Sequence, residues 1–269
     1  MAREAGDLLI SGRGQARVVD TKSSPTDVVT EMDRAAEDLI RRRILAARPG
    51  DAILGEEGGE VVGEPSGERG GQIGAGPAVR WIVDPLDGTV NYLYGLSDWA
   101  VSIAAEVDGT VLAGAVCVPV HRSLFSATAG GGAWLASPWR EGPERLSCNS
   151  GVSLADALVG TGFGYAARRR VVQGQVAASL LPRVRDIRRA GAAAVDLCSL
   201  AAGRLDAFYE RGLHDWDFAA GGLIAREAGA QVAGLHGRAA SESMTLAAGP
   251  GLFSELHDLL ASLDPERDQ

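Results

Sequence analysis

The sequence predicts a layered α/β sandwich in which an α+β half, about residues 1–146, precedes an α/β half, about residues 147–269. Short strand-like segments follow one another between residues 99 and 136, which is typical of an antiparallel sheet. From about residue 147 onward, helical and strand patterns are mixed. We therefore expect the whole chain to form a single domain with one site between its two halves.

Apolar periodicity and terminator residues locate the individual elements. Thr30 with Asp33 three residues later resembles a capping box, and Pro49 ends the helix that follows. Asp108 and Gly109 form a two-residue hairpin signal between two strand-like runs. The expected helices are 1–11 (a short stub), 30–47, 171–181, 192–202, 216–227 and 252–263. The expected strands are 52–55, 81–83, 99–107, 110–120, 124–127, 133–136 and 205–210.

Residues 58–77 differ from the rest of the chain in composition. They are rich in glycine and include Pro65 and Pro77, so we expect neither a helix nor a buried strand there. Because the acidic motifs on either side must meet in one site, we interpret the segment as a mobile surface loop and not as a linker between domains.

The overall composition limits the class of protein. With 46% hydrophobic and 23% charged residues in 269, the chain can bury a sizeable core. Its formal net charge of −9 argues against nucleic acid or an anionic membrane as a nonspecific partner. Three cysteines without CxxC spacing, no signal-peptide pattern and no apolar run near ~18 residues indicate a soluble, reduced, cytoplasmic protein.

The most informative motif is Trp-Ile-Val-Asp-Pro-Leu-Asp-Gly-Thr at residues 81–89. A strand-like run leads directly into Asp84 and Asp87, where Pro85 and Gly88 make the chain turn. Carboxylates held on a rigid turn are ligands that hard cations such as Mg²⁺ require. Asp, Pro and Gly are also ordinary turn residues, but the complete motif favours a metal site.

Three further acidic segments could join this turn. Glu56 and Glu57 follow a short expected strand, Asp217 lies in the first turn of an expected helix, and Asp33 lies in the first turn of another. Each has a simpler interpretation when taken alone, which is a solvated turn for Glu56 and helix capping for Asp33 and Asp217.

Taken together, these segments resemble the inositol monophosphatase family of Mg²⁺-dependent, lithium-sensitive phosphatases. The matching segments are KSSPTDVVTEMD, ILGEEG, WIVDPLDGTVNY, IRRAGAAAVDLC and DAFYERGLHDWDFAAG, in this order along nearly the whole chain. The resemblance implies the αβαβα sandwich of the inositol monophosphatase and fructose bisphosphatase type, and a homodimer. Two features depart from the family: the first helix is shorter than usual, and Asp215 stands where some members carry cysteine.

The resemblance also implies roles for individual residues. Two to three Mg²⁺ ions would be held by Glu56, Asp84, Asp87, Asp217 and the carbonyl of Leu86. The catalytic residues would be Glu56, Thr89 and Asp33, because the Thr89 hydroxyl, oriented by Asp33, would hold and deprotonate the attacking water together with Glu56. The residues expected to contact the substrate are Lys22, Asp87, Gly88, Thr89, Ala193, Glu210 and Asp217. Lys22 could equally be a solvated side chain.

The implied activity is Mg²⁺-dependent hydrolysis of a small-molecule phosphate monoester. Myo-inositol 1-phosphate is favoured, because Glu210 suits neighbouring hydroxyl groups. Fructose 1,6-bisphosphate, histidinol phosphate and 3′-phosphoadenosine 5′-phosphate are alternatives with the same chemistry. The arginines at 168–170 and 183–189 are interpreted as solvated helix faces and not as a second phosphate site. The alternative of another class is a protein-binding factor in transcription or ribosome assembly, a role that some bacterial members have.

Overall fold

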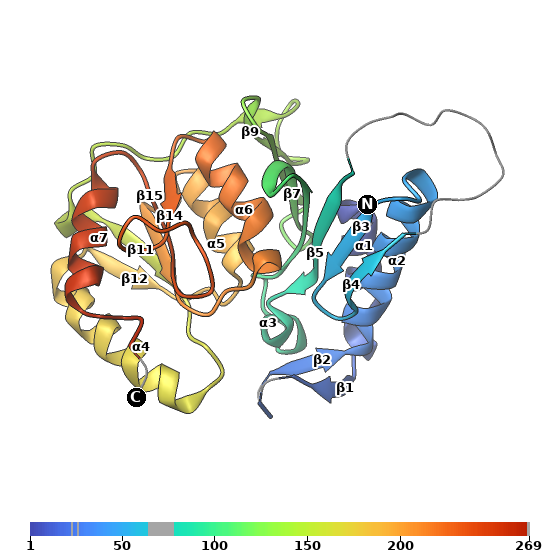
Figure 1. Ribbon diagram of the computed structural model, residues 1–269, viewed down its shortest axis with the longest axis horizontal. Helices are drawn as coiled ribbons and strands as arrows, with labels where there is room; N and C mark the ends of the chain where they lie inside the picture. Colours follow the sequence, from blue (N-terminus) through green and yellow to red (C-terminus); the bar gives the residue numbers. More distant parts are fainter. Residues whose placement is uncertain (23, 26, 64–77, 268–269) are drawn as a thin grey trace.

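The computed structural model describes residues 1–22, 24–25, 27–63 and 78–267, and its two main β-sheets are separated by helices (Figure 1). In spatial order, the large sheet consists of β10 (Glu144–Arg145), β9 (Gly132–Ala136), β8 (Ser123–Thr128), β7 (Thr110–Val118), β6 (Ala100–Val107), β5 (Arg80–Asp87), β3 (Ala52–Gly55) and β4 (Gly59–Val62). The small sheet consists of β12 (Asp186–Arg188), β11 (Leu158–Thr161), β13 (Ala207–Glu210), β15 (Thr245–Ala248) and β14 (Gln231–Ala233). A separate hairpin is formed by β1 (Val18–Thr21) and β2 (Val28–Thr30).

Helices cover both sheets and fill the space between them. The α-helices are α1 (Ala2–Gly12), α2 (Glu31–Ala47), α3 (Thr89–Leu93), α4 (Ala167–Leu180), α5 (Ala193–Ala201), α6 (Asp215–Glu227) and α7 (Leu252–Ser262). Short 3₁₀ turns span Arg13–Gln15, Leu154–Asp156 and Leu181–Arg183. Helices α1 and α2 pack on the outer face of the large sheet, α5 and α6 lie between the sheets, and α4 and α7 cover the small sheet (Figure 1). This order confirms the predicted αβαβα sandwich.

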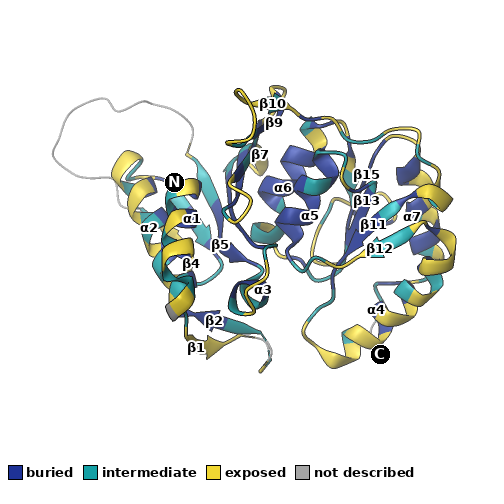
Figure 2. Ribbon diagram, turned by 180° about the vertical axis from the view of Figure 1, so that it is seen from behind, coloured by how far each residue is buried: buried dark blue, intermediate teal, exposed yellow. Residues whose placement is uncertain are grey.

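The two middle helices approach their neighbours closely because small residues line the contacts. A Cβ at Gly221 of α6 would lie 2.9 Å from the Cβ of Leu197 on α5. A Cβ at Gly114 of β7 would lie 3.0 Å from the Cα of Ala220. Both helices are consequently buried over most of their length (Figure 2). Such close packing holds the first residues of α5 and α6 in a constant position relative to the large sheet.

Strand direction in the large sheet brings two chain ends together. Its neighbouring strands are antiparallel except for β3 and β5, which run parallel. Parallel neighbours end at the same edge of a sheet. The residues that follow β3 therefore lie beside the last residues of β5.

Helix α1 supports α3 from behind. The phenol of Tyr92 donates a hydrogen bond to the Leu9 carbonyl at 2.7 Å, and Tyr92 packs edge to face against Trp99 with ring centroids 5.0 Å apart. The guanidinium of Arg13 lies 5.7 Å from the centroid of each ring, within the range of a cation–π interaction. Arg13 Nε also donates to the Tyr92 carbonyl at 3.2 Å. The short first helix is thus attached directly to the helix that begins at Thr89.

Most predicted elements are confirmed within a few residues. The expected helix 30–47 is α2, and Thr30 with Asp33 forms the complete capping box. The hairpin turn predicted at Asp108 and Gly109 has φ angles of 49° and 74°, as a tight hairpin turn requires. The structure adds several strands that were not expected, namely β1, β2, β4, β10, β11, β12, β14 and β15.

The prediction of a loop over residues 58–77 was wrong at its beginning. Gly59–Val62 is an antiparallel edge strand paired with β3, and all four residues are exposed, so their sequence has no alternation to reveal the strand. Residues 64–77 lie outside the described residues. Within the part of the chain that the structure describes, no helix has the length and apolar character needed to cross a membrane.

Candidate active site

The adjacent ends of β3 and β5 place the first acidic side chains. The backbone N–H of Glu56 donates to the Val83 carbonyl at 3.2 Å, so Glu56 extends the parallel pairing by one residue beside Asp84. Pairing of β5 with β6 then shifts between Asp84 and Asp87, where Pro85 interrupts the strand. This irregularity keeps Asp84 and Asp87 at the same mouth of the sheet instead of on opposite faces.

The end of β5 and the turn after it are fixed by a side-chain-to-backbone bond and by a glycine. The N–H of Leu86 donates to Asp84 Oδ1 at 2.9 Å, which holds the carboxylate against the turn. Gly88 follows with φ of +87°, and a Cβ there would lie 3.0 Å from the Asp98 carbonyl oxygen. A larger residue at Gly88 would strain the turn in two ways, because its φ would be positive and its Cβ would press on the Asp98 carbonyl oxygen.

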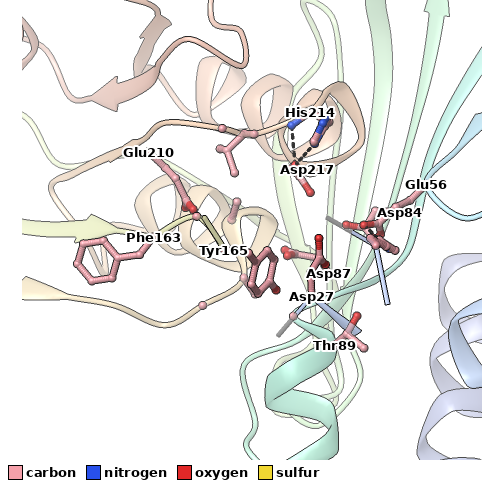
Figure 3. A pocket seen from close by; sticks show the side chains of 18 of the residues that line it. Asp27, Glu56, Asp84, Asp87, Thr89, Phe163, Tyr165, Glu210, His214 and Asp217 are labelled. Carbon is pink, nitrogen blue, oxygen red and sulfur yellow. Dashed lines mark hydrogen bonds and ion pairs between the residues drawn. The ribbon is translucent and has the colours of Figure 1, made fainter. Parts of the chain in front are cut away.

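Helix α6 supplies the third acidic group. Asp217 lies in its first turn and accepts a 2.6 Å hydrogen bond from the His214 N–H. Asp84, Asp87 and Asp217 each place a carboxylate oxygen within 4.8 Å of the others (Figure 3). The position of Asp217 depends on the close packing of α6 on the large sheet.

The clustered carboxylates repel one another in a buried place. Burial raises the pKa of Asp84 and of Asp87 well above the ordinary value, and the nearby charges of Glu56 and Asp217 raise both further. Burial also raises the pKa of Glu56 to about 7, although Lys22 acts in the opposite direction. These carboxyl groups resist ionisation because no sufficient positive charge lies near them. A hard divalent cation would supply that charge, and carboxylate oxygens are ligands that it prefers.

Lys22 is a pocket residue and not a solvated side chain. Its Nζ lies 2.6 Å from Glu56 Oε1 and 2.5 Å from Glu57 Oε1. The turn that carries these glutamates is held from α2, because the buried carboxylate of Glu37 accepts the N–H of Glu57 at 2.8 Å and of Gly58 at 2.9 Å. Glu37 had not been expected to support the site, since a single acid on a helix gives no sequence signal.

Thr89 and Asp33 form the hydrogen-bonded pair that was expected. The Thr89 hydroxyl lies 2.9 Å from Asp33 Oδ1 and 3.1 Å from the Leu86 carbonyl oxygen, and it can donate its proton to either. Asp33 Oδ2 accepts the N–H of Thr30 at 2.9 Å, so one carboxylate both caps α2 and orients Thr89. Burial raises the pKa of Asp33, against the effect of its hydrogen bonds from Thr30 and Thr89.

The acid cluster opens into a cavity of about 630 Å³ that residues of both halves line. Glu210 and Phe163 lie across it from Glu56 and Asp84 (Figure 3), and Ala193 and Tyr165 also line it. The N–H of Ala194 donates to Asp87 Oδ2 at 2.8 Å, which connects the start of α5 to the acid cluster. The structure therefore brings every predicted site residue to one cavity or its immediate wall.

Sequence reasoning missed several residues that line this cavity. They are Asp27, Val28, Phe163, Gly164, Tyr165, Ala166, Arg169, Arg189, Gly191, Ala192, Arg211, Gly212, Leu213, His214, Trp216 and Glu242. As expected, Arg168, Arg170, Arg188 and Arg189 are exposed, but Arg169 and Arg189 also line the cavity, and the second arginine segment includes strand β12 instead of a helix face. The aromatic Gly-Phe-Gly-Tyr segment at 162–165 was a signal that could have been used.

A sandwich of two sheets separated by helices, with clustered carboxylates beside a threonine–aspartate pair in the cavity between its halves, is typical of a metal-dependent phosphatase. The match to the family model named "Inositol monophosphatase family" extends over residues 1–267, and the chain belongs to this family.

Known relatives agree with this assignment. The "Inositol-1-monophosphatase SuhB" of Mycobacterium tuberculosis is 48% identical over 242 residues, which cover 88% of this chain and 79% of the relative. The "Nus factor SuhB" of Pseudomonas aeruginosa is 39% identical over 242 residues, covering 88% of this chain and 83% of the relative. The solved structure "Mycobacterium tuberculosis SuhB" superposes with a TM-score of 0.80 at 41% identity, covering 99% of this chain and 94% of that chain.

The raised pKa values predict that the metal-free site opposes folding. When the pKa of a carboxyl group is higher in the folded than in the unfolded protein, the folded protein becomes less stable as pH rises. This loss begins near the pKa of the unfolded state, about 4, and is complete above the pKa of the folded state. At pH 8 without metal, Asp84→Asn should therefore raise the melting temperature by at least about 2 °C, roughly 1 kcal/mol for a domain of this size. A divalent cation should raise the melting temperature of the unmodified protein more than that of the variant.

Calorimetry at pH 5 and pH 8, with EDTA or with MgCl₂, tests this expectation. Asp38→Asn, an exposed change on α2, is the matched control. A metal-free Asp84→Asn protein that melts below the unmodified protein at pH 8 would show that the cluster does not oppose folding.

Proposed function

We propose that the protein hydrolyses a small-molecule phosphate monoester, with myo-inositol 1-phosphate as the favoured substrate. The observation that best supports this function is that Asp84, Asp87 and Asp217 share one cavity, with Thr89 on one side and Glu210 on the other (Figure 3). Family membership supports the phosphatase activity. In this proposal the phosphate lies beside the acids and the alcohol lies beside Glu210.

The donor set supports Mg²⁺ as the cofactor. We propose that two to three ions are held by Glu56, Asp84, Asp87, Asp217 and the Leu86 carbonyl. All of these ligand atoms are oxygen, and Mg²⁺ prefers oxygen. Bound Mg²⁺ would lower the pKa of water and compensate the negative charge of the phosphate, which an uncompensated acid cluster would repel.

The protein's own contribution to proton transfer is assigned to Thr89. Its Oγ1 would take a proton from the attacking water, because Asp33 Oδ1 lies 2.9 Å away and can accept the hydroxyl proton in turn. Glu56 would hold the same water from the opposite side. The backbone N–H groups of Gly88 and Thr89, at the start of α3, are proposed to face the phosphate, with Lys22 near them.

The alcohol would be bound on the far side of the cavity. Burial raises the pKa of the Glu210 carboxyl well above its ordinary value, and Asp217 and Asp87 contribute to that increase. Cations bound at the two aspartates would remove this repulsion and make the carboxylate of Glu210 an acceptor for hydroxyl groups. The backbone of Ala193 is proposed to contact a further hydroxyl. Lithium inhibition, a homodimer and a cytoplasmic location belong to the same proposal.

A second candidate function is that of a protein-binding factor in transcription. The relative from Pseudomonas aeruginosa carries the name "Nus factor SuhB" at 39% identity, which favours this candidate. A binding role should survive the loss of turnover. If this role exists, the Asp84→Asn protein should capture the same transcription proteins from a lysate as the unmodified protein does. Failure of both proteins to capture them excludes the role.

Removal of the Thr89 hydroxyl should reduce turnover strongly. Thr89→Ala is expected to lower kcat by about 10²–10⁴, the usual contribution of a positioned proton-transfer group, with little change in Mg²⁺ affinity. Thr89→Ser keeps the hydroxyl and should retain most of the activity. Asp33→Asn should cause a smaller loss in the same direction. Phosphate release with saturating Mg²⁺ measures these values, and an effect of Thr89→Ala on KM alone would contradict the proposed role.

Changing Glu210 should affect selection of the alcohol and not the chemistry. An unpaired or weakened acceptor for substrate hydroxyls costs about 1–3 kcal/mol, so Glu210→Gln should reduce kcat/KM for inositol 1-phosphate roughly tenfold to a hundredfold. Hydrolysis of p-nitrophenyl phosphate, which has no such hydroxyls, should remain within about twofold. Equal losses for both substrates would show that Glu210 does not contact the alcohol.

A further inference from the structure

We propose that Gln173 of α4 positions Glu210 for the alcohol of the substrate, by fixing the separation of the two loops that follow β11 and β13. Gln173 is thus a positioning residue for substrate selection, although it is not one of the site residues named above. The inference rests on the proposed phosphatase function and assigns a further residue to it.

Glu210 lies where two parallel strands of the small sheet separate. The pairing of β11 with β13 ends at Thr161 and Tyr209. Gly162 and Glu210 are the next residues along the two chains, and a Cβ at Gly162 would collide with the Glu210 carboxyl group. The side chain of Glu210 therefore packs directly on the neighbouring chain, and its position depends on how far apart the two chains lie.

The side-chain amide of Gln173 bridges the two chains just beyond this point. Its Oε1 accepts a hydrogen bond from the Gly164 N–H at 3.0 Å, and its Nε2 donates to the Arg211 carbonyl at 3.4 Å. One of these backbone groups is a donor and the other is an acceptor. An amide satisfies both, because it carries an acceptor oxygen and donor hydrogens. Gln173 thereby continues between the loops the cross-chain bonding that the strand ladder provides before them.

Packing alone does not set the separation of the loops. Gln173 is buried, with an exposed fraction of 8%, and it lines a second cavity of about 10 Å³, which has room for about one water molecule. Phe163 and Arg211 line both this small cavity and the active-site cavity. The two loops therefore form a wall shared by both cavities, and the hydrogen bonds of Gln173 hold that wall together across the void.

The same face of α4 contacts both loops at a second place. Arg169 precedes Gln173 by four residues, which puts the two side chains on one side of the helix. A Cβ at Gly164 would lie 3.0 Å from Arg169 Cδ, and a Cβ at Gly212 would collide with Arg169 Nη1. Arg169 thus crosses both loops, while Gln173 bonds to their backbones. A movement of either loop relative to α4 would break these contacts.

The consequence for the substrate follows from the geometry of hydrogen bonds, which weaken steeply when distance or angle departs from the optimum. If the two loops moved apart, the Glu210 carboxyl would lose its support on Gly162 and its fixed position in the cavity. Asp84, Asp87 and Thr89 belong to the large-sheet half and would keep theirs. Loss of the Gln173 amide should therefore weaken selection of the alcohol without disturbing the chemistry.

Two variants of Gln173 test the proposal. Gln173→Met keeps the approximate size of the side chain and removes both hydrogen bonds. Gln173→Glu keeps the acceptor for the Gly164 N–H, but a carboxylate has no donor for the Arg211 carbonyl. We define the selectivity as kcat/KM for inositol 1-phosphate divided by kcat/KM for p-nitrophenyl phosphate, both with saturating Mg²⁺. Gln173→Met should lower it by about 3–30-fold, because a misplacement of roughly 1 Å can cost up to ~10²-fold in rate. Gln173→Glu should lower it by a smaller factor.

A double-mutant cycle with Glu210→Gln tests whether Gln173 acts through Glu210. Residues that contribute to one interaction have non-additive effects. In the Glu210→Gln protein, Gln173→Met should therefore change the selectivity by less than about twofold. Gln175→Met is the matched control, because Gln175 is an exposed glutamine of the same helix whose side chain bonds to Arg267 and to neither loop. It should leave the selectivity unchanged.

The outcomes separate this inference from the phosphatase function. Equal losses for both substrates in Gln173→Met, or effects of Gln173→Met and Glu210→Gln that multiply, would show that Gln173 does not position Glu210. Melting temperatures of all variants ensure that every assay is made on folded protein, and Gln173→Glu decides the test if Gln173→Met does not fold. If the unmodified protein with Mg²⁺ hydrolyses neither substrate, the proposed function is wrong and the inference is wrong with it.

Discussion

Mutual repulsion among buried carboxylates is the constraint around which this fold is organised. Asp84 and Asp87 come from the end of one strand, Glu56 from its parallel neighbour, and Asp217 from a helix packed between the sheets. Each acid alone would prefer water, and none of them can relax away, because a turn, a strand pairing or a helix start holds it. The sandwich therefore stores an unfavourable arrangement of charge that a bound cation can convert into a favourable one.

The two halves of the molecule divide the work of the site. The large-sheet half contributes Asp84 and Asp87 at the end of β5, and the hydrogen-bonded pair of Thr89 and Asp33 at the starts of α3 and α2. The small-sheet half contributes Asp217 at the start of α6 and the side chains at the other end of the cavity, several of them on loops. Strand ends and helix starts hold their side chains in place, whereas loops can change their side chains without disturbing the acid cluster.

The sequence was most informative where chemistry and local structure coincide. Asp84, Asp87, Thr89 and Asp217 could be predicted because strand ends, glycine and helix starts accompany them in continuous motifs. Pairing partners distant in the chain carried no such signal. The contact of Lys22 with Glu56 and Glu57 depends on how the first hairpin meets the end of β3.

The arginines and the unpredicted strands also show that the sequence does not reveal contacts between residues distant in the chain. Arg189 resembled its exposed neighbour Arg188, and only the fold shows that the chain turns at Gly191 and directs one of them into the cavity. Strands β11, β12 and β14 have three or four residues each, and their stability comes from neighbours far along the chain.

The short helix α1, which the sequence predicts only as a stub, likewise has contacts that the sequence does not reveal. Tyr92 and Arg13 connect it to the turn of α3 that bears Thr89. A shortened or extended amino terminus would thus act on the Thr89 hydroxyl from the rear, which makes the length of this helix a means of moving that hydroxyl during divergence without replacing a single cavity residue.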